Sequence, residues 1–490
     1  MEQTQGISRN KVAGALLWKF LERIGVNGAQ FLLQVVLARL LSPDHYGVLS
    51  MMAIFTTLAG VFVQQGFSVA LVQNKDVTEE DYSTVLWLSL AVALGMYGIL
   101  FFAAPLIGQF YNVPKIKYYL RVLALMLFPG ALNSVQTAKL KREINFKKIF
   151  ISHFVGIVFS GVVSIVIAYM GGGVWALVAH SILNLLINCI VVQFVVHFRV
   201  RFVCNLARAK TLFRFGWKLL ASSLIETIYG DIQGLVVGKK YSAGDLGFYS
   251  RGTQFPQFIT STVNTTVQSV LLPVMSKKQN EPEVLKSMMR KSVILSSYLI
   301  FPMMAGLAAI APQLVSFLLG DKWLPCVPFL RICCFTFGFY PVHTCNLQAI
   351  NAIGRSDIYL KLEIIKKIYG IIALAISLIF FNSPLAIAMT GIFTTVISCF
   401  VNASPNKKLI NYSYFEQMKD ILPSFAISLA MLGVVLVVGQ LNINNLLLLA
   451  IQIIVGIFAY LILSMITGLE PCKILLEEIR PFSKKIKLRK

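Results

Sequence analysis

The sequence predicts an all-α integral membrane protein. Of its 490 residues, 57% are hydrophobic and only 13% are charged, and the mean hydropathy is +0.74. A soluble domain carries about 25% charged residues. Long apolar runs recur along the chain, each near the roughly 20 residues that a helix needs to cross a bilayer. Because the alternating pattern of a membrane barrel is absent, helices are the backbone structure that satisfies every amide in lipid.

About fourteen spans are expected, and short polar connections separate most of them. The predicted ranges are 15–40, 46–72, 82–107, 118–138, 148–170, 173–197, 211–238, 246–273, 290–318, 325–350, 358–381, 384–404, 420–439 and 444–468. The first run is full length, so we expect it to remain as a membrane helix and not to act as a cleaved signal peptide.

The basic residues indicate the orientation in the membrane. The net charge is +23, yet the connections after odd-numbered spans hold only 5 of the 44 Lys and Arg residues. Most of the others lie at the termini and near the connections after even-numbered spans, for example in "KLKREINFKK" (139–148). The positive-inside rule then places both termini in the cytoplasm. We expect these clusters to contact membrane lipids, and we expect no nucleic-acid partner.

Metal and cofactor chemistry is not expected from this sequence. The eight cysteines are scattered without the spacing of a zinc site, and the five histidines form no cluster with carboxylates or cysteines. We therefore predict no metal, no cofactor and no enzymatic activity.

Landmarks in the first half recur in the same order in the second half. "WKFL" (18–21) matches "WKLL" (217–220), "LSPDHYGVLS" (41–50) matches "YSAGDLGFYS" (241–250), "AAPLIGQF" (103–110) matches "APQLVSF" (311–317), and "LRVLAL" (120–125) matches "LRICCF" (330–335). Ordered matches 199 to 210 residues apart indicate a tandem duplication. Since six spans separate the copies, both have the same orientation, as in transporters with parallel repeats.

The repeat predicts the domain organisation. Residues 1–200 and 201–405 are two six-helix lobes, residues 406–470 hold two additional C-terminal helices, and residues 471–490 form a basic cytoplasmic tail. An interface between two such lobes, near the middle of the bilayer, is where a substrate can be exposed to one side and then the other.

Polar residues form a stripe along the first span. Lys19, Arg23, Asn27, Gln30 and Gln34 fall within an arc of about 80° on a helix. The matching span carries polar residues at the equivalent positions, including Lys218, Glu226 and Gln233, and the next span adds Arg251 and Gln254. Charged groups inside a membrane span are costly, so we expect them to face protein or water in one shared cavity.

The charged members of the stripe have simpler alternatives. Lys19 can extend to the cytoplasmic interface, and Arg23 can pair only with Glu22 as a structural ion pair. Glu226 is the carboxylate of the stripes; it is a candidate for ion coupling, and a static link to Lys218 is the alternative. Arg121 and Arg331, at matching repeat positions, are interpreted as structural.

A cavity that combines cations with amides and hydroxyls suits a ligand that joins phosphate to sugars. Arg and Lys make charge-assisted hydrogen bonds to phosphate oxygens, and amide side chains replace the water lost from sugar hydroxyls. We assign the phosphate contacts to Lys19, Arg23 and Arg251. The sugar contacts are assigned to Asn27, Gln30, Gln34, Lys218, Gln233 and Gln254.

Several longer segments resemble a known family. "LARLLSPDHYGVLSMMAIF", "GFSVALVQNKDVTEEDYSTVLWLSLAVAL", "LLGDKWLPCVPFLRIC" and "AIGRSDIYLKL" are similar to Wzx-type polysaccharide exporters, the lipid-linked oligosaccharide flippases of the MOP superfamily that include colanic acid and teichuronic acid exporters. The resemblance extends from about residue 10 to residue 410.

The resemblance implies a two-lobe, MATE-like bundle in the bacterial inner membrane. It implies alternating access, in which a polyprenyl-pyrophosphate-linked repeat unit passes from the cytoplasmic to the periplasmic leaflet for surface polysaccharide synthesis. Related lipid II flippases hold pyrophosphate with arginines on helices 1, 2 and 8; Arg23 and Arg251 are their counterparts here. No basic residue lies between 46 and 72, so Lys19 is the candidate for the third charge. Polysaccharide polymerase and chain-length proteins are the implied partners.

Two other functions fit parts of this pattern. A MATE-type multidrug antiporter shares the two-lobe architecture but has an acidic cavity, whereas the stripes here are mainly cationic. A membrane glycan polymerase or ligase acts on the same lipid carrier but usually needs a large external loop, and the odd-numbered connections here are short.

Overall fold

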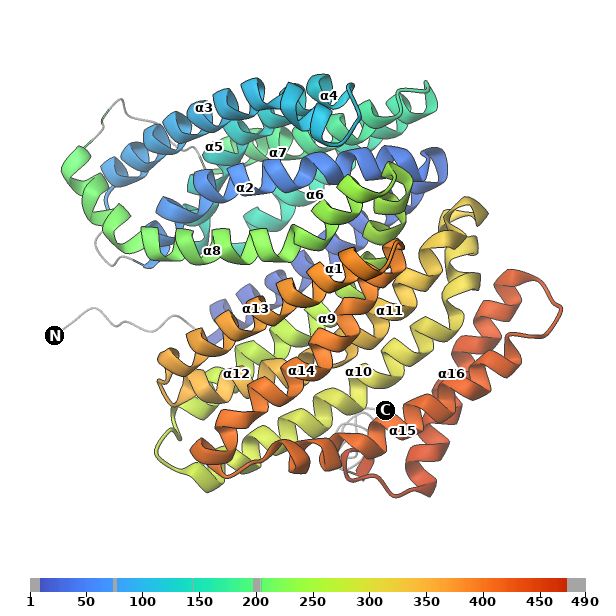
Figure 1. Cartoon of the computed structure of the whole chain (residues 1–490). Coiled ribbons are helices and arrows are strands. Elements are labelled where there is room, and N and C mark those ends of the chain that lie inside the picture. The colour runs from blue at the N-terminus through green and yellow to red at the C-terminus, as the bar shows by residue number, and fades with distance from the viewer. Residues whose placement is uncertain (1–8, 74–76, 144, 197–202, 204, 474–490) are drawn as a thin grey trace, which may run out of the picture. The chain divides into compact units, whose positions relative to one another are not determined.

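The computed structural model describes residues 9–73, 77–143, 145–196, 203 and 205–473. This part of the chain is helical and contains no strand. The elements are α1 (Arg9–Leu40), α2 (Pro43–Gln73), α3 (Glu79–Phe110), α4 (Ile116–Leu123), η1 (Ala124–Met126), α5 (Leu127–Arg142), α6 (Phe146–Tyr169), α7 (Val174–Val196), α8 (Leu206–Lys240), α9 (Ala243–Ser276), α10 (Pro282–Leu319), η2 (Asp321–Cys326), α11 (Val327–Gly338), α12 (Tyr340–Ala352), α13 (Ser356–Phe380), α14 (Pro384–Ile410), α15 (Tyr414–Val438) and α16 (Asn445–Ile466) (Figure 1).

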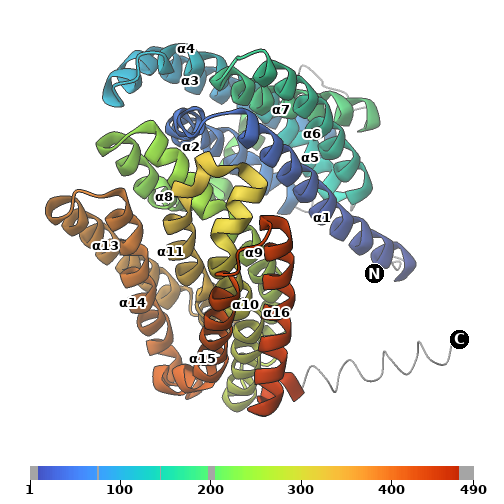
Figure 2. The same ribbon diagram turned by 90° about the vertical axis from the view of Figure 1, so that its right-hand side faces the viewer.

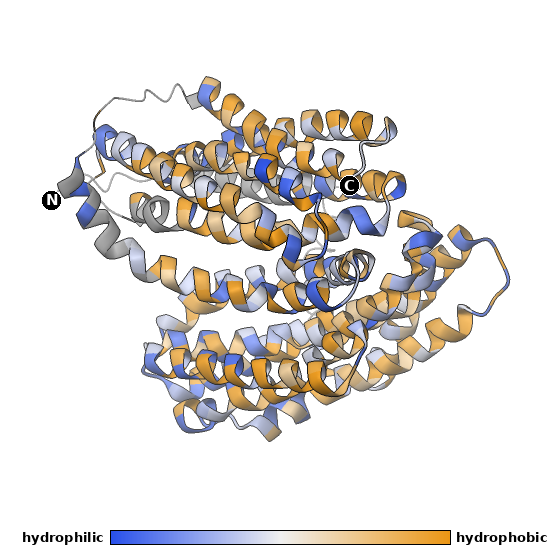
Figure 3. Ribbon diagram, turned by 45° about the horizontal axis from the view of Figure 1, so that its top comes forward, coloured by the Kyte–Doolittle hydropathy of each residue, from blue (hydrophilic) through white to orange (hydrophobic). Residues whose placement is uncertain are grey.

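Ten helical segments in the described residues are long and apolar enough to cross a membrane. Most residues along the helices are apolar (Figure 3), and many large apolar side chains are exposed, as expected of a protein whose solvent is lipid. The expected count of fourteen is four higher than these ten. The other long helices are α1, α8, α9 and α13, and three of them carry the predicted polar stripes. Fourteen spans therefore stay a prediction, whereas the all-helical, multi-pass fold is confirmed.

The chain divides into two compact units, Met1–Gly247 and Phe248–Lys490. Unit 1 contains α1 to α8 and the first turn of α9. Unit 2 contains the rest of α9 and α10 to α16. The predicted lobes 1–200 and 201–405 were defined by the repeat; they stay a prediction, as do the boundaries at 406 and 471, and residues 474–490 of the tail lie outside the described part.

Small residues allow close packing within unit 1. Every fourth residue of α6 from position 152 is small and buried, namely Ser152, Gly156, Ser160, Ser164 and Ala168. A side chain added at Gly156 would lie 3.0 Å from the backbone oxygen of Asn184 on α7. Such stripes bring helix backbones together in membranes. This face of α6 holds α7 in unit 1, while the neighbouring Gly161 leaves room for Leu33 of α1.

In unit 2, α15 lies beside α10 and α16 (Figure 2), and polar contacts attach it to other helices. Arg290 of α10 makes two hydrogen bonds to Asp420, at 2.8 and 2.9 Å. A buried amide cluster joins α15 to two further helices: Asn346 Nδ2 of α12 donates to Gln417 Oε1 of α15 at 2.8 Å, and Asn406 Nδ2 of α14 donates to Asn346 Oδ1 at 2.7 Å. Because unpaired polar groups are costly in an apolar interior, this cluster specifies how α12, α14 and α15 pack.

The helix starts at the matched motifs have similar hydrogen bonds. The Ser42 N–H donates to His45 Nδ1 at 3.3 Å, and the Ser242 N–H donates to Asp245 Oδ2 at 3.1 Å. Each motif ends one long helix and begins the next: α1 and α2 in one case, α8 and α9 in the other. These equivalent turns support the predicted duplication.

Candidate substrate-binding residues

For the phosphate-binding candidates on α1, the structure describes only the helical backbone. Lys19 and Arg23 lie in α1, and Lys218 lies in α8, but their side chains are outside the part of the structure that is described. The direction of these side chains, and of Glu22, is therefore not tested, and their assignment stays a prediction.

The described part of the α1 stripe includes one buried hydrogen-bond chain. Gln30 Nε2 lies 3.2 Å from His180 Nε2, and His180 Nδ1 lies 3.1 Å from Ser160 Oγ. All three groups are satisfied if the amide donates to Nε2 and Nδ1–H donates to the hydroxyl. His180 is buried, so this chain positions α1 against α6 and α7. Sequence reasoning identified Gln30 as polar but did not identify His180 as its partner.

The remaining candidates of unit 1 differ in exposure. Asn27 and Glu226 are exposed, whereas Gln34 and Gln233 are half-buried. The stripes of α1 and α8 belong to the same unit, in which α8 packs on α2. Exposed polar groups on these long helices are compatible with a wet face, as the sequence predicts.

Arg251 and Gln254 lie together on α9 in unit 2. Arg251 Nη1 donates to Gln254 Oε1, and its guanidinium carbon is 6.0 Å from the centre of the Trp323 ring. Arg251 is 6% exposed. A buried guanidinium held by an amide and an aromatic ring is well positioned, and it would reach a ligand only when these contacts open. Trp323 precedes α11 by four residues, and no sequence spacing pointed to it.

A polar pair on α13 was not singled out from the sequence. Lys366 Nζ lies 2.5 Å from Glu363 Oε1, and both side chains are half-buried. On the neighbouring α14, Asn402 Nδ2 lies 3.2 Å from Nδ1 of the half-buried His343. The sequence could have indicated this pair, because Lys and Glu within an otherwise apolar run mark a functional site or a structural pair. Among the described residues, no group of His, Cys, Asp and Glu side chains forms a metal site.

The fold and these polar helices define a multi-pass helical membrane protein. A solved structure titled lipid II flippase MurJ, inward closed conformation, superposes with a TM-score of 0.72 at 17% identity, covering 92% of this chain and 98% of that one. An inward-facing multidrug resistance MATE family transporter of the MOP superfamily superposes with a TM-score of 0.57 at 15% identity, covering 86% and 98%. Both likenesses concern the fold.

The chain belongs to the polysaccharide biosynthesis protein family, whose pattern matches residues 36–328. It is 25% identical to the succinoglycan biosynthesis transport protein ExoT of Rhizobium meliloti, over 86% of this chain and 83% of that protein. It is 24% identical to the teichuronic acid biosynthesis protein TuaB of Bacillus subtilis, over 83% and 86%. The resemblance to polysaccharide exporters is confirmed: this is a polysaccharide-related membrane transporter in a bacterial membrane.

Proposed function

We propose that this chain moves a polyprenyl-pyrophosphate-linked oligosaccharide repeat unit from the cytoplasmic to the outer leaflet. The observation that carries the proposal is full-length similarity to polysaccharide transport proteins combined with the fold of a lipid II flippase. Both point to a substrate that joins a lipid to sugars. The polar stripes on α1, α8 and α9 supply groups for the part of that substrate that cannot dissolve in lipid.

In this proposal, Lys19, Arg23 and Arg251 bind the pyrophosphate, while Asn27, Gln30, Gln34, Lys218, Gln233 and Gln254 contact the glycan. The cation-rich stripe compensates the charge of the phosphates, and the amides replace water around the hydroxyls. Glu226 is exposed on the same helix as Lys218 and is the candidate for ion coupling. The proposed partners are the polymerase and chain-length proteins that receive the unit.

The membrane potential favours outward movement. In a cell that is negative inside, moving two negative charges across the full field is downhill by about 4 to 5 kcal/mol per 100 mV. The basic residues predict that both termini lie in the cytoplasm.

The test uses a bacterial host whose surface polysaccharide depends on this chain. Arg23→Ala and Arg251→Ala should each lower export by about ten-fold or more, because a charge-assisted hydrogen bond to phosphate is lost. Lys408→Ala removes an exposed charge elsewhere and should leave export unchanged. Carrier-linked units should accumulate on the cytoplasmic face in the arginine variants.

Two results contradict the proposal. Unchanged export in the Arg23→Ala, Arg251→Ala double variant removes the phosphate assignment. Unpolymerised units on the outer face of a strain lacking the chain indicate an enzyme. The MATE-like fold supports a second candidate, a cation-coupled multidrug antiporter, which predicts efflux of cationic dyes from a transport-deficient host.

A further inference from the structure

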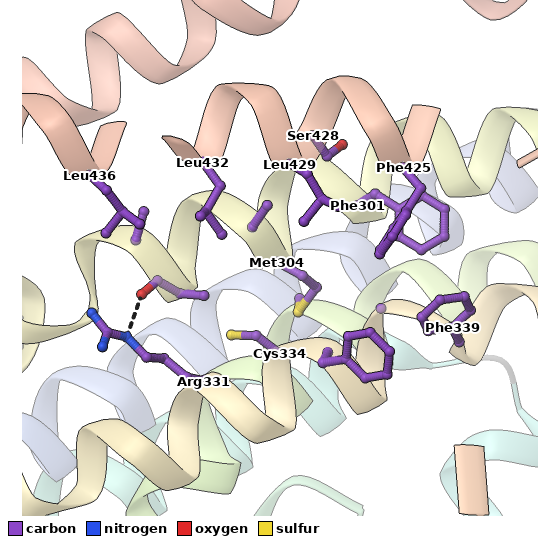
Figure 4. Close-up of a pocket in the computed structure, with 15 residues that line it drawn as sticks. Phe301, Met304, Arg331, Cys334, Phe339, Phe425, Ser428, Leu429, Leu432 and Leu436 are labelled. Atoms are coloured by element: carbon purple, nitrogen blue, oxygen red, sulfur yellow. Dashed lines mark hydrogen bonds between the residues drawn. The ribbon is translucent and has the colours of Figure 1, made fainter. Parts of the chain in front are cut away.

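Unit 2 contains a pocket between α10, α11 and α15. Its volume is about 370 Å³, and its walls are almost entirely apolar. Figure 4 shows Arg331 at one end beside Leu436, and Phe339 and Phe425 at the other end. The wall formed by α15 has no counterpart in the first repeat, because α15 belongs to the C-terminal helices that follow the duplication. The pocket is thus specific to the second half of the chain.

In the first repeat, the region around Arg121 is equivalent to the region around Arg331, and side chains fill it. We call each region the corner formed by its arginine. Arg121 Nε donates to the backbone oxygen of Phe101 at 3.1 Å, and Arg331 Nε donates to that of Ala308, also at 3.1 Å. Phe101 and Ala308 are 207 residues apart, the offset of the "AAPLIGQF" match. The same backbone contact is therefore made at equivalent positions, with a ring at one and a methyl group at the other.

That difference in side chain accounts for the pocket. In unit 1 the Phe101 ring lies 4.1 Å from the Arg121 guanidinium and 5.9 Å from the Tyr97 ring. In unit 2 the equivalents of Phe101 and Tyr97 are Ala308 and Met304, and both line the pocket. In unit 1 the Phe101 ring packs over Arg121, whereas in unit 2 an apolar space lies beside Arg331.

Arg331 is available to bind a ligand. It is exposed, whereas Arg121 is half-buried. Within the described part of the chain only its Nε hydrogen is engaged, which leaves the other guanidinium N–H groups to bind an anion. Leu429 and Leu436, on the α15 wall, are 49% and 40% exposed, so the apolar space adjoins the surface that faces lipid.

We propose that this pocket holds one acyl chain of a membrane glycerophospholipid whose phosphate binds Arg331. An apolar slot with one cation at its end matches a hydrocarbon chain attached to a phosphate, because the guanidinium can make charge-assisted hydrogen bonds to phosphate oxygens. Residues near the start of α11 lie at the end that the basic-residue pattern assigns to the outer leaflet. The proposal does not depend on the transported substrate proposed above.

The lipid would complete the packing of α15. At its first turns α15 is held to α10 by Arg290–Asp420 and Lys286–Glu416. Toward its other end, Leu432 and Leu436 of α15 line the pocket together with residues of α10 and α11. A bound acyl chain would supply the apolar contacts that Phe101 and Tyr97 supply in unit 1.

Photo-crosslinking of the purified full-length protein in detergent tests the proposal. The probe is phosphatidylglycerol with a diazirine on one acyl chain, and the labelled peptides are mapped by mass spectrometry. Labels should fall on α10, α11 and α15 at the pocket. Ala308→Phe copies the residue of the first repeat and should lower this labelling at least about ten-fold, because each methylene excluded from an apolar site weakens binding about four-fold. Ala450→Phe, at an exposed position of α16, should keep the labelling.

Competition with unlabelled lipids identifies the ligand. Phosphatidylglycerol should displace the probe better than diacylglycerol, which lacks the phosphate, and Arg331→Gln should abolish that preference even if Ala308→Phe does not fold. The proposal is overturned by absence of label at the pocket, by undiminished labelling of a folded Ala308→Phe variant, or by an unchanged preference in Arg331→Gln. Stronger displacement by undecaprenyl phosphate than by phosphatidylglycerol also overturns it and assigns the pocket to the lipid carrier.

Discussion

The corner formed by Phe101 and Arg121 in unit 1 and the corner formed by Ala308 and Arg331 in unit 2 have the same backbone hydrogen bond and different side-chain packing. In the first, an aromatic ring covers the guanidinium; in the second, a methyl group leaves a pocket. The comparison teaches that the arginine interacts with the backbone of the preceding helix, so side-chain volume is free to change around it. Because the hydrogen bond to the backbone needs only the Nε hydrogen, the rest of the guanidinium can bind a ligand without loss of the fold.

At the matched starts of α2 and α9, in contrast, there is no space in which a side chain could change its volume. A side chain on Gly47 would lie 1.7 Å from the backbone oxygen of Ala243, and one on Gly247 would lie 2.2 Å from that of Pro43. All four residues belong to unit 1, and the two glycines occupy the same position in the matched motifs 41–50 and 241–250. Here backbone touches backbone, so no side chain can replace the hydrogen at either position.

Of the variants that test this comparison, Gly47→Leu should have the largest effect on folding. The neighbouring backbone cannot move aside as a side chain can, so the clash should exceed the usual overpacking cost of about 1 to 3 kcal/mol. We expect little folded protein after purification, as measured by size-exclusion chromatography, and no export. Gly95→Leu is the control, because no heavy atom lies within 4 Å of its added Cβ. Equal yields of the two variants would show that the helix starts are not in close contact.

Phe101→Ala tests the filled corner. Removing the ring takes away its contacts with Arg121 and Tyr97, and large-to-small changes of this kind cost about 3 to 5 kcal/mol at fully buried sites. Since Phe101 is half-buried, we expect a loss near the lower end, measured as a lower melting temperature in detergent. Phe102→Ala removes the same ring at a position that is 79% exposed and should have little effect. A smaller loss at Phe101 than at Phe102 would contradict the packing role.

The sequence predicted the fold well where a helix is continuous and apolar. The predicted span 173–197 corresponds to α7 (Val174–Val196), and 148–170 corresponds to α6 (Phe146–Tyr169). The predicted single spans 118–138 and 325–350 are each interrupted: the first by η1 between α4 and α5, the second by the boundary between α11 and α12. Hydropathy does not register such a break; the one between α11 and α12 lies at Pro341, which lacks the N–H that a continuous helix needs.

The candidate site was predicted less completely, because its partners come from distant parts of the chain. Helical periodicity placed Gln30 on the polar stripe, but His180, which lies on α7, could be identified as its partner only from the structure. Arg251 was identified as a charge within a span, yet its burial beside Trp323 follows from the fold of η2 against α9. Periodicity determines which side chains share a helix face. It does not determine what that face contacts.

Ser242→Ala should give the smallest effect, and it tests whether the two helix starts are stabilised differently. Ser242 Oγ accepts from the Asp245 N–H at 3.0 Å, and the Ser242 N–H donates to Asp245 Oδ2, so the two residues cap α9 reciprocally. Loss of the hydroxyl should cost about 1 kcal/mol. The equivalent Ser42→Ala should cost less, because the His45 N–H donates to the backbone oxygen of Ser42 at 3.2 Å, which alanine retains, and not to the hydroxyl.

The measurement is the melting temperature of each variant beside Ser242→Thr, which keeps the capping oxygen and should stay close to the parent. If Ser42→Ala were as destabilising as Ser242→Ala, the two turns would be capped alike. In that case the hydroxyl of Ser242, which accepts from the Asp245 N–H, would contribute no more to the start of α9 than the hydroxyl of Ser42 contributes to the start of α2. If only Ser242→Ala lowers the melting temperature, α9 begins with a side-chain cap. The start of α2 then depends mainly on the close contact at Gly47 and on His45.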